Sequence, residues 1–120
     1  MPSILLVEDS REQRKIIMAM LQAANIEDIV EANHGLEALD FLKERSFDLV
    51  ICDLMMPEMD GMELIREIRE NYSDTKIIAM SGGGTTALNY YIEIMEKKLA
   101  KTISKPFTKD QISGLVKSLI

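Results

Sequence analysis

Short apolar runs alternate strictly with longer segments of helical apolar spacing along this chain, and that alternation limits the fold more than any other feature. Several runs are apolar on consecutive residues, which is typical of strands covered on both faces in a parallel sheet. The predicted strands cover residues 4–7, 29–32, 49–52, 77–80 and 102–104. Because parallel strands need right-handed crossovers, the pattern predicts an open α/β sheet with helices on both faces.

Five segments between and after the runs place apolar residues on one side of a helix and charged residues on the other. We expect each apolar stripe to pack against the sheet. The stripes are Ile16, Ile17, Met20, Leu21 and Ala24; Leu36, Leu39 and Leu42; Met62, Ile65 and Ile68; Leu88, Tyr91, Ile92 and Met95; and Ile112, Leu115, Val116 and Leu119.

Length and composition exclude several classes of protein. The 120 residues match one ordinary domain, and we expect a single domain over residues 1–120. The net charge of -6 disfavours binding to nucleic acid phosphates, and the single cysteine, Cys52, excludes an internal disulfide. Since the apolar stretches are far shorter than the roughly 20 residues that span a bilayer, we expect a cytoplasmic protein without membrane contact.

Polar residues that follow the predicted strands indicate where a ligand would bind. In an open doubly wound sheet, ligands bind outside the carboxyl ends of the strands. We therefore expect the side chains after the first, third, fourth and fifth strands to share one edge of the sheet. They are Glu8 and Asp9, Asp53, Ser81, and Lys105.

Glu8, Asp9 and Asp53 would bring three carboxylates together, and their repulsion needs to be offset. Two unit charges about 4 Å apart repel by about 4 kcal/mol at an effective dielectric constant near 20. Raised pKa values, a neighbouring lysine or a hard cation such as Mg²⁺ could each offset it. Lys105 and Ser81 add an ammonium and a hydroxyl donor suited to phosphoryl oxygens. This set is typical of an aspartyl-phosphate site with Asp53 as the nucleophile.

Simpler roles compete for each residue taken alone. An acidic pair such as Glu8 and Asp9 often caps a helix, and Asp53 could form a turn. Ser81 could belong to a plain glycine loop. Their shared position at strand ends favours a common site. His34, next to Gly35, is expected to serve as a turn or cap residue and not as a catalyst.

Four segments resemble the receiver domain of two-component response regulators. They are S-I-L-L-V-E-D-S, D-L-V-I-C-D-L-M-M-P-E-M-D-G-M-E-L-I, K-I-I-A-M-S-G and S-K-P-F. The resemblance covers essentially the whole chain and implies a flavodoxin-like (βα)5 fold of strand order 2-1-3-4-5. It also implies a stand-alone phosphorelay receiver without an effector domain. Such a domain is not a conventional enzyme, because it catalyses only its own phosphotransfer and autodephosphorylation.

The resemblance assigns the phosphoryl site residue by residue. Asp53 matches the phosphoacceptor, which takes a phosphoryl group from a phosphohistidine on a sensor histidine kinase or a phosphotransfer protein. Glu8, Asp9 and Asp53 match the carboxylates that hold Mg²⁺ or Mn²⁺, and the backbone carbonyl of Met55 matches a further ligand. The Met55 side chain is apolar where many relatives are polar, so we expect it to tune the lifetime of the phosphate.

The resemblance also implies a switch. Ser81 matches the hydroxyl residue that moves toward the phosphoryl group, and Lys105 matches the lysine that contacts it. The Lys105–Pro106 peptide bond is expected to be cis. Thr102 stands where such domains often carry a Tyr or Phe that reports this movement, so no aromatic switch is expected here. The output is a protein-interaction surface near the fourth helix and fifth strand, read by a downstream protein or by a second copy of the chain.

Two other functions stay open at this point. A flavodoxin-like protein could hold the phosphate of FMN in S-G-G-G-T-T, with the hydroxyls of Ser81, Thr85 and Thr86. Against this, the glycine loop follows the fourth strand and not the first, and the chain has no tryptophan. A pseudo-receiver would fold in the same way and act as a docking module without being phosphorylated.

Overall fold

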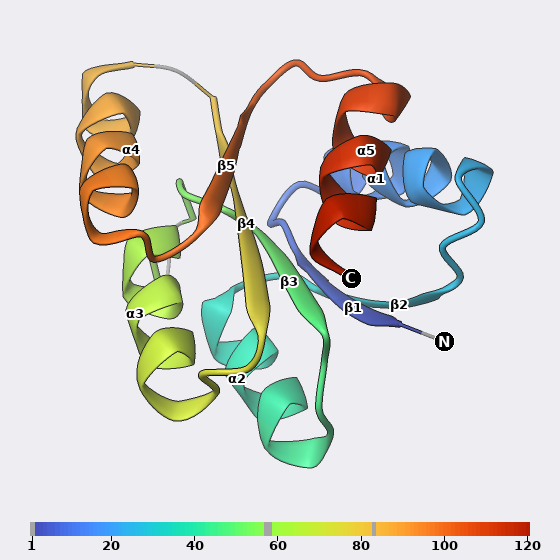
Figure 1. The fold of residues 1–120 in the computed structure, drawn as a ribbon, viewed down its shortest axis with the longest axis horizontal. Helices are drawn as coiled ribbons and strands as arrows, with labels where there is room; N and C mark the ends of the chain where they lie inside the picture. Colours follow the sequence, from blue (N-terminus) through green and yellow to red (C-terminus); the bar gives the residue numbers. More distant parts are fainter. Residues whose placement is uncertain (1, 57–58, 83) are drawn as a thin grey trace.

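A five-stranded parallel sheet of order β2-β1-β3-β4-β5 forms the central layer of the computed structural model (Figure 1). The structure describes residues 2–56, 59–82 and 84–120, with the backbone alone for Thr85 and Thr86. The strands are β1 (Ser3–Val7), β2 (Asp28–Ala32), β3 (Leu49–Asp53), β4 (Lys76–Ser81) and β5 (Lys101–Ser104). The predicted fold class and strand order are confirmed.

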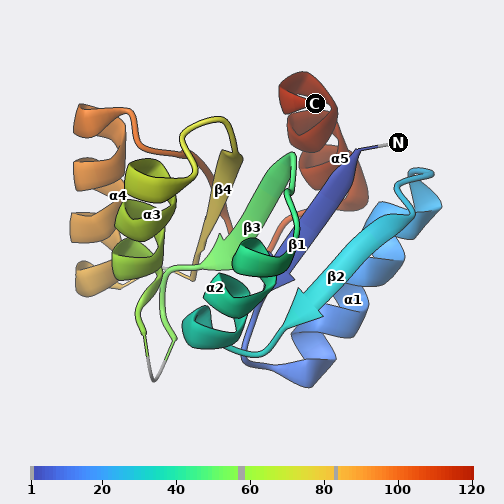
Figure 2. The ribbon, with the colours of Figure 1, turned by 90° about the horizontal axis from the view of Figure 1, so that it is seen from below.

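Helices cover both faces of this sheet, as Figures 1 and 2 show. The helices are α1 (Arg11–Ala23), α2 (Gly35–Glu44), α3 (Gly61–Asn71), α4 (Thr85–Lys97) and α5 (Lys109–Leu119). Because successive strand residues point to opposite faces, Leu6 packs in the cluster with α1 and α5, and Leu5 packs in the cluster with α2, α3 and α4. Within the described ranges, no helix is long and apolar enough to span a membrane.

Side chains cap four of the five helices at their first residues. Each accepts a hydrogen bond from a backbone N–H one turn into its helix, which satisfies a group that would otherwise lack a partner. These caps are Ser10, His34, Asp60 and Thr108. Helix α4 differs, because its N-cap residue is Gly84, with φ 93°, and no side chain caps it among the described residues. The predicted role of His34 as a cap residue is therefore confirmed.

Gly61 brings the start of α3 unusually close to the end of β3. A Cβ atom at this position would lie 2.3 Å from the carbonyl oxygen of Asp53 and 2.5 Å from the Cα of Leu54. The backbone N–H of Gly61 donates to the carbonyl of Leu54 at 3.0 Å. Only glycine allows this approach without a backbone shift. The packing of α3 therefore depends on the strand end that carries Asp53.

Helix α4 does not bury the stripe that its sequence pattern predicts. Leu88, Ile92 and Met95 are 56%, 45% and 60% exposed, whereas Ala87 and Ile94 are buried. The prediction that this stripe packs against the sheet is wrong. The helix is apolar on two sides, and the side with Ala87 and Ile94 is the buried one. The helix lies beside β4 and β5 (Figure 1).

Candidate functional site

Glu8, Asp9 and Asp53 lie together where β1 and β3 end. One carboxylate oxygen from each residue lies within 4.8 Å of those from the other two. The two strands pair in parallel, with Val7 beside Cys52, so the residues that follow them meet at the same edge of the sheet. Glu8 is only 1% exposed and Asp53 is buried, while Asp9 faces solvent. The predicted convergence of the three carboxylates is confirmed.

Lys105 provides the positive charge between these carboxylates. Its Nζ lies 2.8 Å from Glu8 Oε1 and 2.7 Å from Asp53 Oδ2. A third hydrogen bond, 2.7 Å long, goes to Oε1 of Gln13. Burial would lower the pKa of Lys105, but the hydrogen bonds to Asp53 and Glu8 outweigh it and raise that pKa above its ordinary value. The side chain is therefore an ammonium. Of the three predicted ways to offset the repulsion, the structure shows two, this lysine and a raised pKa of Glu8.

The carboxyl group of Glu8 is in an environment suited to a cation. Burial raises the pKa of Glu8 to about 7, the hydrogen bond from Lys105 opposes that rise, and the charge of Asp53 adds to it. Its Oε2 atom is buried without a hydrogen-bond partner among the described residues. Hard divalent cations bind such carboxylate oxygens. The residues present therefore fit Mg²⁺.

Both carboxylate oxygens of Asp53 accept hydrogen bonds. Oδ1 accepts from the backbone N–H of Met55 at 2.9 Å, and Oδ2 accepts from Lys105. The strand end is held in place because the N–H of Leu54 donates to the carbonyl of Met80 at 3.0 Å. The exposed Met55 side chain lines a groove of about 570 Å³ together with Asp53 and Lys105. Asp53 is thus both a turn residue and a member of the acidic cluster.

Ser81 is buried at the end of β4, and its carbonyl accepts from the backbone N–H of Lys105 at 2.8 Å. The Lys105–Pro106 peptide bond is cis, as the resemblance to receiver domains implies. Thr102 lies elsewhere: it pairs with Ala79 in the sheet and lines a separate hollow at the beginning of β5. The side chains of Thr85 and Thr86, which the FMN alternative invokes, lie outside the described residues.

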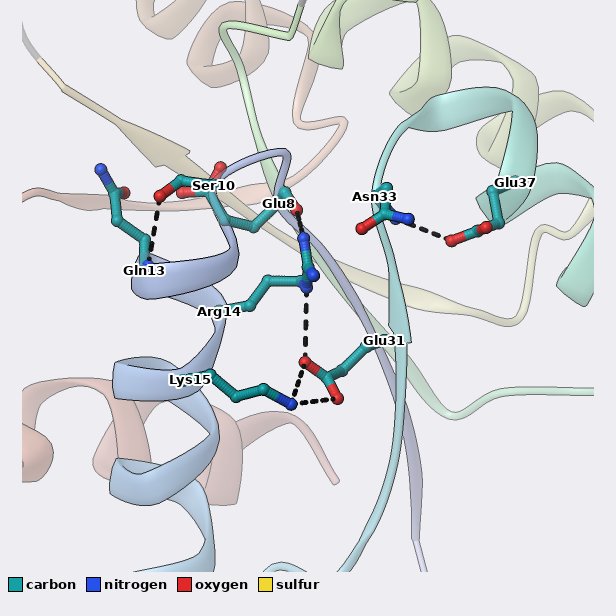
Figure 3. Close-up of polar contacts among 8 residues, drawn as sticks. All are labelled: Glu8, Ser10, Gln13, Arg14, Lys15, Glu31, Asn33 and Glu37. Atoms are coloured by element: carbon teal, nitrogen blue, oxygen red, sulfur yellow. Dashed lines mark hydrogen bonds and ion pairs between the residues drawn. The ribbon is translucent and has the colours of Figure 1, made fainter.

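Arg14 and Gln13 complete the site, and the sequence analysis missed both. The buried Arg14 donates through Nη1 to the carbonyl of Glu8 at 2.8 Å and through Nε to Glu31 Oε1 at 3.3 Å (Figure 3). Arg14, Ile17 and Leu21 are the buried residues of α1. Arg14 precedes Ile17 by three residues and Leu21 by seven, so it lies on the same helix face as these apolar residues. A charged residue on an apolar helix face was the signal from which Arg14 could have been predicted.

Comparisons with known proteins agree with this geometry. The response regulator receiver domain model matches residues 4–117. The response regulator receiver protein CpdR of Brucella abortus (strain 2308) is 36% identical over 121 residues, which cover 100% of this chain and 98% of CpdR. The structure of a response regulator receiver domain protein from Clostridium thermocellum has a TM-score of 0.90 at 28% identity, covering 100% of this chain and 94% of that one.

A third relative was solved with a metal ion. The response regulator protein TrrA from Thermotoga maritima, in complex with Mg²⁺-BeF, has a TM-score of 0.86 at 31% identity, and the match covers 100% of both chains. The chain belongs to the response regulator receiver domain family of two-component signalling. Receiver domains bind Mg²⁺ at an acidic pocket, and the acidic group in this chain is Glu8, Asp9 and Asp53.

Proposed function

We propose that Asp53 accepts a phosphoryl group from the phosphohistidine of a sensor histidine kinase or a phosphotransfer protein. A carboxylate oxygen of Asp53 attacks phosphorus, the P–N bond breaks, and its electron pair returns to the imidazole nitrogen. The observation that carries this proposal is the place of Lys105 Nζ, 2.7 Å from Asp53 Oδ2 and 2.8 Å from Glu8 Oε1. An ammonium held there stabilises negative charge on the phosphoryl oxygens.

Glu8, Asp9 and Asp53, with the backbone carbonyl of Met55, would hold the divalent cation, Mg²⁺ or Mn²⁺. When bound, the ion would supply positive charge that stabilises the negative charge of the phosphoryl oxygens. The proposal is supported by the all-oxygen ligand set and by Glu8 Oε2, which is buried without a partner among the described residues. Arg14 is a positioning residue, because it fixes the backbone carbonyl of Glu8.

Phosphorylation of Asp53 would break the present ion pair with Lys105. A phosphoryl group brings two negative charges and several acceptor oxygens, to which the Lys105 ammonium and the Ser81 hydroxyl can donate. The backbone carbonyl of Ser81 accepts a hydrogen bond from the backbone N–H of Lys105. Ser81 is also the last residue of β4, the strand that precedes α4. The change at Asp53 would thus bias a two-state surface on α4 and β5, which a downstream protein reads.

The test of phosphoacceptance is labelling by acetyl phosphate with Mg²⁺, followed by mass spectrometry. The wild type gains one phosphoryl group, Asp53→Asn gains none, and the exposed control Asp40→Asn is labelled like the wild type. Labelling that survives Asp53→Asn would make the assignment of Asp53 wrong. A wild type that is never labelled, by acetyl phosphate or by kinase, would favour the pseudo-receiver alternative.

The Met55 side chain would set how long the phosphate lasts, since it borders Asp53 in the groove beside the acceptor. We expect Met55→Asn to change the rate of dephosphorylation, measured as loss of the label after acetyl phosphate is removed. Equal rates for the two proteins would contradict this role.

A further inference from the structure

Lys105 has three hydrogen-bond acceptors, and only two of them are carboxylates. Its Nζ donates to Glu8 Oε1 at 2.8 Å, to Asp53 Oδ2 at 2.7 Å and to the amide oxygen Oε1 of Gln13 at 2.7 Å. An ammonium has three N–H donors, so these acceptors can occupy all of them. The neutral amide of Gln13 therefore holds the ammonium as closely as the carboxylate of Asp53 does.

The first turn of α1 places Gln13 beside Lys105. Ser10 is the N-cap of α1, and its Oγ accepts a hydrogen bond from the backbone N–H of Gln13 at 3.3 Å (Figure 3). The cap therefore fixes the backbone of Gln13, while its side chain is exposed. Gln13 also lines the groove of about 570 Å³ that includes Asp53, Met55 and Lys105. The amide thus borders the groove into which the acceptor carboxylate opens.

The two carboxylate acceptors of Lys105 are the ones that the proposed reaction withdraws. Glu8 and Asp53 belong to the acidic group that would hold the divalent cation, and a phosphoryl group would occupy one oxygen of Asp53. Gln13 lies outside the acidic group. A neutral amide also attracts a divalent ion less than a carboxylate does, because it has no net charge. Of the three acceptors, Gln13 is the one that Lys105 can keep throughout the reaction.

We infer that Gln13 is a positioning residue, which holds the Lys105 ammonium beside Asp53 while the carboxylates are given up to the ion and the phosphoryl group. The lysine stem is flexible, so an ammonium released from both carboxylates would otherwise turn to solvent. The charge-assisted bond to Gln13 counts for more once the carboxylates no longer compete for the same ammonium. Loss of the amide therefore weakens the ion-bound state more than the ion-free state. The inference rests on the proposed function, in which Lys105 stabilises the phosphoryl oxygens.

Isothermal titration calorimetry with Mg²⁺ tests this inference without any phosphoryl donor. We expect Gln13→Met to bind Mg²⁺ about threefold more weakly than the wild type. In the Lys105→Met background the same substitution should leave the affinity unchanged, because Gln13 acts through the ammonium. Methionine is close to glutamine in length and helix propensity, and Gln13 is exposed, so the fold is kept. The matched control is Gln22→Met, at another exposed position of α1, which should bind like the wild type.

Labelling by acetyl phosphate at saturating Mg²⁺ gives a second measurement. Gln13→Met should be labelled roughly fivefold more slowly than the wild type, because the ammonium is no longer held beside the phosphoryl oxygens. The double variant Gln13→Met/Lys105→Met should be labelled no more slowly than Lys105→Met alone. A merely structural effect of the substitution would slow labelling by the same factor in both backgrounds.

Three results would overturn the inference: a wild type that binds no Mg²⁺, an affinity of Gln13→Met equal to that of the wild type, or an equal loss of affinity in the wild-type and Lys105→Met backgrounds. A loss confined to the proteins that retain Lys105 supports it. A wild type that is never labelled contradicts the phosphoacceptor role alone, and the calorimetric comparison still decides the role of Gln13.

Discussion

At the carboxyl ends of β1 and β3 the chain compensates its own charge, whereas at the beginning of β4 and β5 it does not. Glu8 and Asp53 share the ammonium of Lys105, which comes from the far end of the sequence. Lys76 and Lys101, at the opposite end of the sheet, have no carboxylate partner among the described residues. The acidic end is therefore negative and partly neutralised by a lysine of the same chain. The other end is positive and is not neutralised by any described residue.

This difference bears on the chemistry proposed for the acidic end. A lysine on a flexible stem can give up its carboxylates to a divalent ion and turn toward a phosphoryl group, so internal compensation is reversible. A cluster of like charges without carboxylates of its own has no such internal alternative. The proposed change of partners at the acidic end can therefore take place within one molecule once an ion and a phosphoryl group are supplied, whereas the described residues leave the cationic end uncompensated.

At neutral pH, the largest effect is expected from Gly61→Ala, which would disturb the acidic end through its backbone. The new Cβ would meet the Asp53 carbonyl oxygen at 2.3 Å, so α3 or the end of β3 must move. We expect the free energy of unfolding to fall by roughly 3 kcal/mol. Chemical denaturation measures this fall, and a Mg²⁺ titration should show weaker binding as well.

Gly114→Ala is the matched control for that substitution. Nothing lies within 4 Å of a Cβ at this position in α5. Alanine has the higher helix propensity, so we expect Gly114→Ala to stabilise the protein by up to about 1 kcal/mol. Equal changes at the two glycines would contradict the close approach of α3 to Asp53.

Lys105→Met removes the positive charge that pairs with Glu8 and Asp53. Without the ammonium, Glu8 and Asp53 keep no counter-charge from the chain, so Mg²⁺ should bind about tenfold more tightly by isothermal titration calorimetry. Labelling by acetyl phosphate should slow at least tenfold, since the phosphoryl oxygens lose a donor. Lys109→Met, at an exposed position of α5, should change neither. Weaker Mg²⁺ binding in Lys105→Met would mean that Lys105 assists the ion and does not compete with it.

The pKa of the buried Cys52 thiol depends in part on the charge of the acidic end, because Cys52 directly precedes Asp53 in β3. Burial raises the pKa of this thiol from 9.0 to about 12, and the charge of Asp53 adds to the rise. The unfolded chain therefore loses the proton first, and the stability contributed by the neutral thiol is complete below pH 9 and is lost as the pH rises toward 12.

The expected slope is about 1.4 kcal/mol per pH unit. Denaturation at several pH values should show the free energy of unfolding of the wild type falling relative to that of Cys52→Ala, once the pH exceeds 9. A difference that stays constant from neutral pH to strongly alkaline pH would mean that the thiol titrates normally in the folded protein.

The smallest effect is expected at the cationic end. Lys101→Gln removes one of four neighbouring positive charges, so it should stabilise the protein by a few tenths of a kcal/mol, at roughly the level of surface charge effects. Salt near 0.5 M should remove the gain. Lys97→Gln should do the opposite, because the Lys97 ammonium is paired with Glu93 at 3.3 Å. Destabilisation by both substitutions would contradict the difference between the two ends.

The bounds of the strands could be predicted closely, because a short run of consecutive apolar residues is typical of a strand that is buried on both faces. Residues 49–52, for example, are predicted as a strand, and β3 spans Leu49–Asp53 with every residue buried. Once the strand ends are known, parallel pairing brings Glu8, Asp9 and Asp53 to one edge, so the acidic cluster was predictable too. Phosphoryl transfer to Asp53 stays a prediction until it is measured.

Features that depend on how a helix is rotated could not be predicted in the same way. Periodicity does not tell which of two apolar sides of α4 is buried, so Leu88 and Met95 were placed on the wrong side. Arg14 reaches the Glu8 carbonyl only because of how α1 packs across β1 and β2. Glu8 and Lys105 are 97 positions apart. The strand ends predicted that they lie at one edge of the sheet, but not which carboxylate oxygens the ammonium contacts.

The missing side-chain cap of α4 has a dynamic consequence. Glycine at an N-cap is weaker than a capping side chain by a few tenths of a kcal/mol, so α4, with Gly84 as its N-cap, unwinds its first turn at slightly lower cost than the four helices with a capping side chain. Amide hydrogens at the start of α4 should therefore exchange with solvent sooner than those at the other helix starts. The strand end at Ser81 adjoins this turn, so a signal from Asp53 could be transmitted as a change in the fraction of time that one turn is open, without any rigid-body movement.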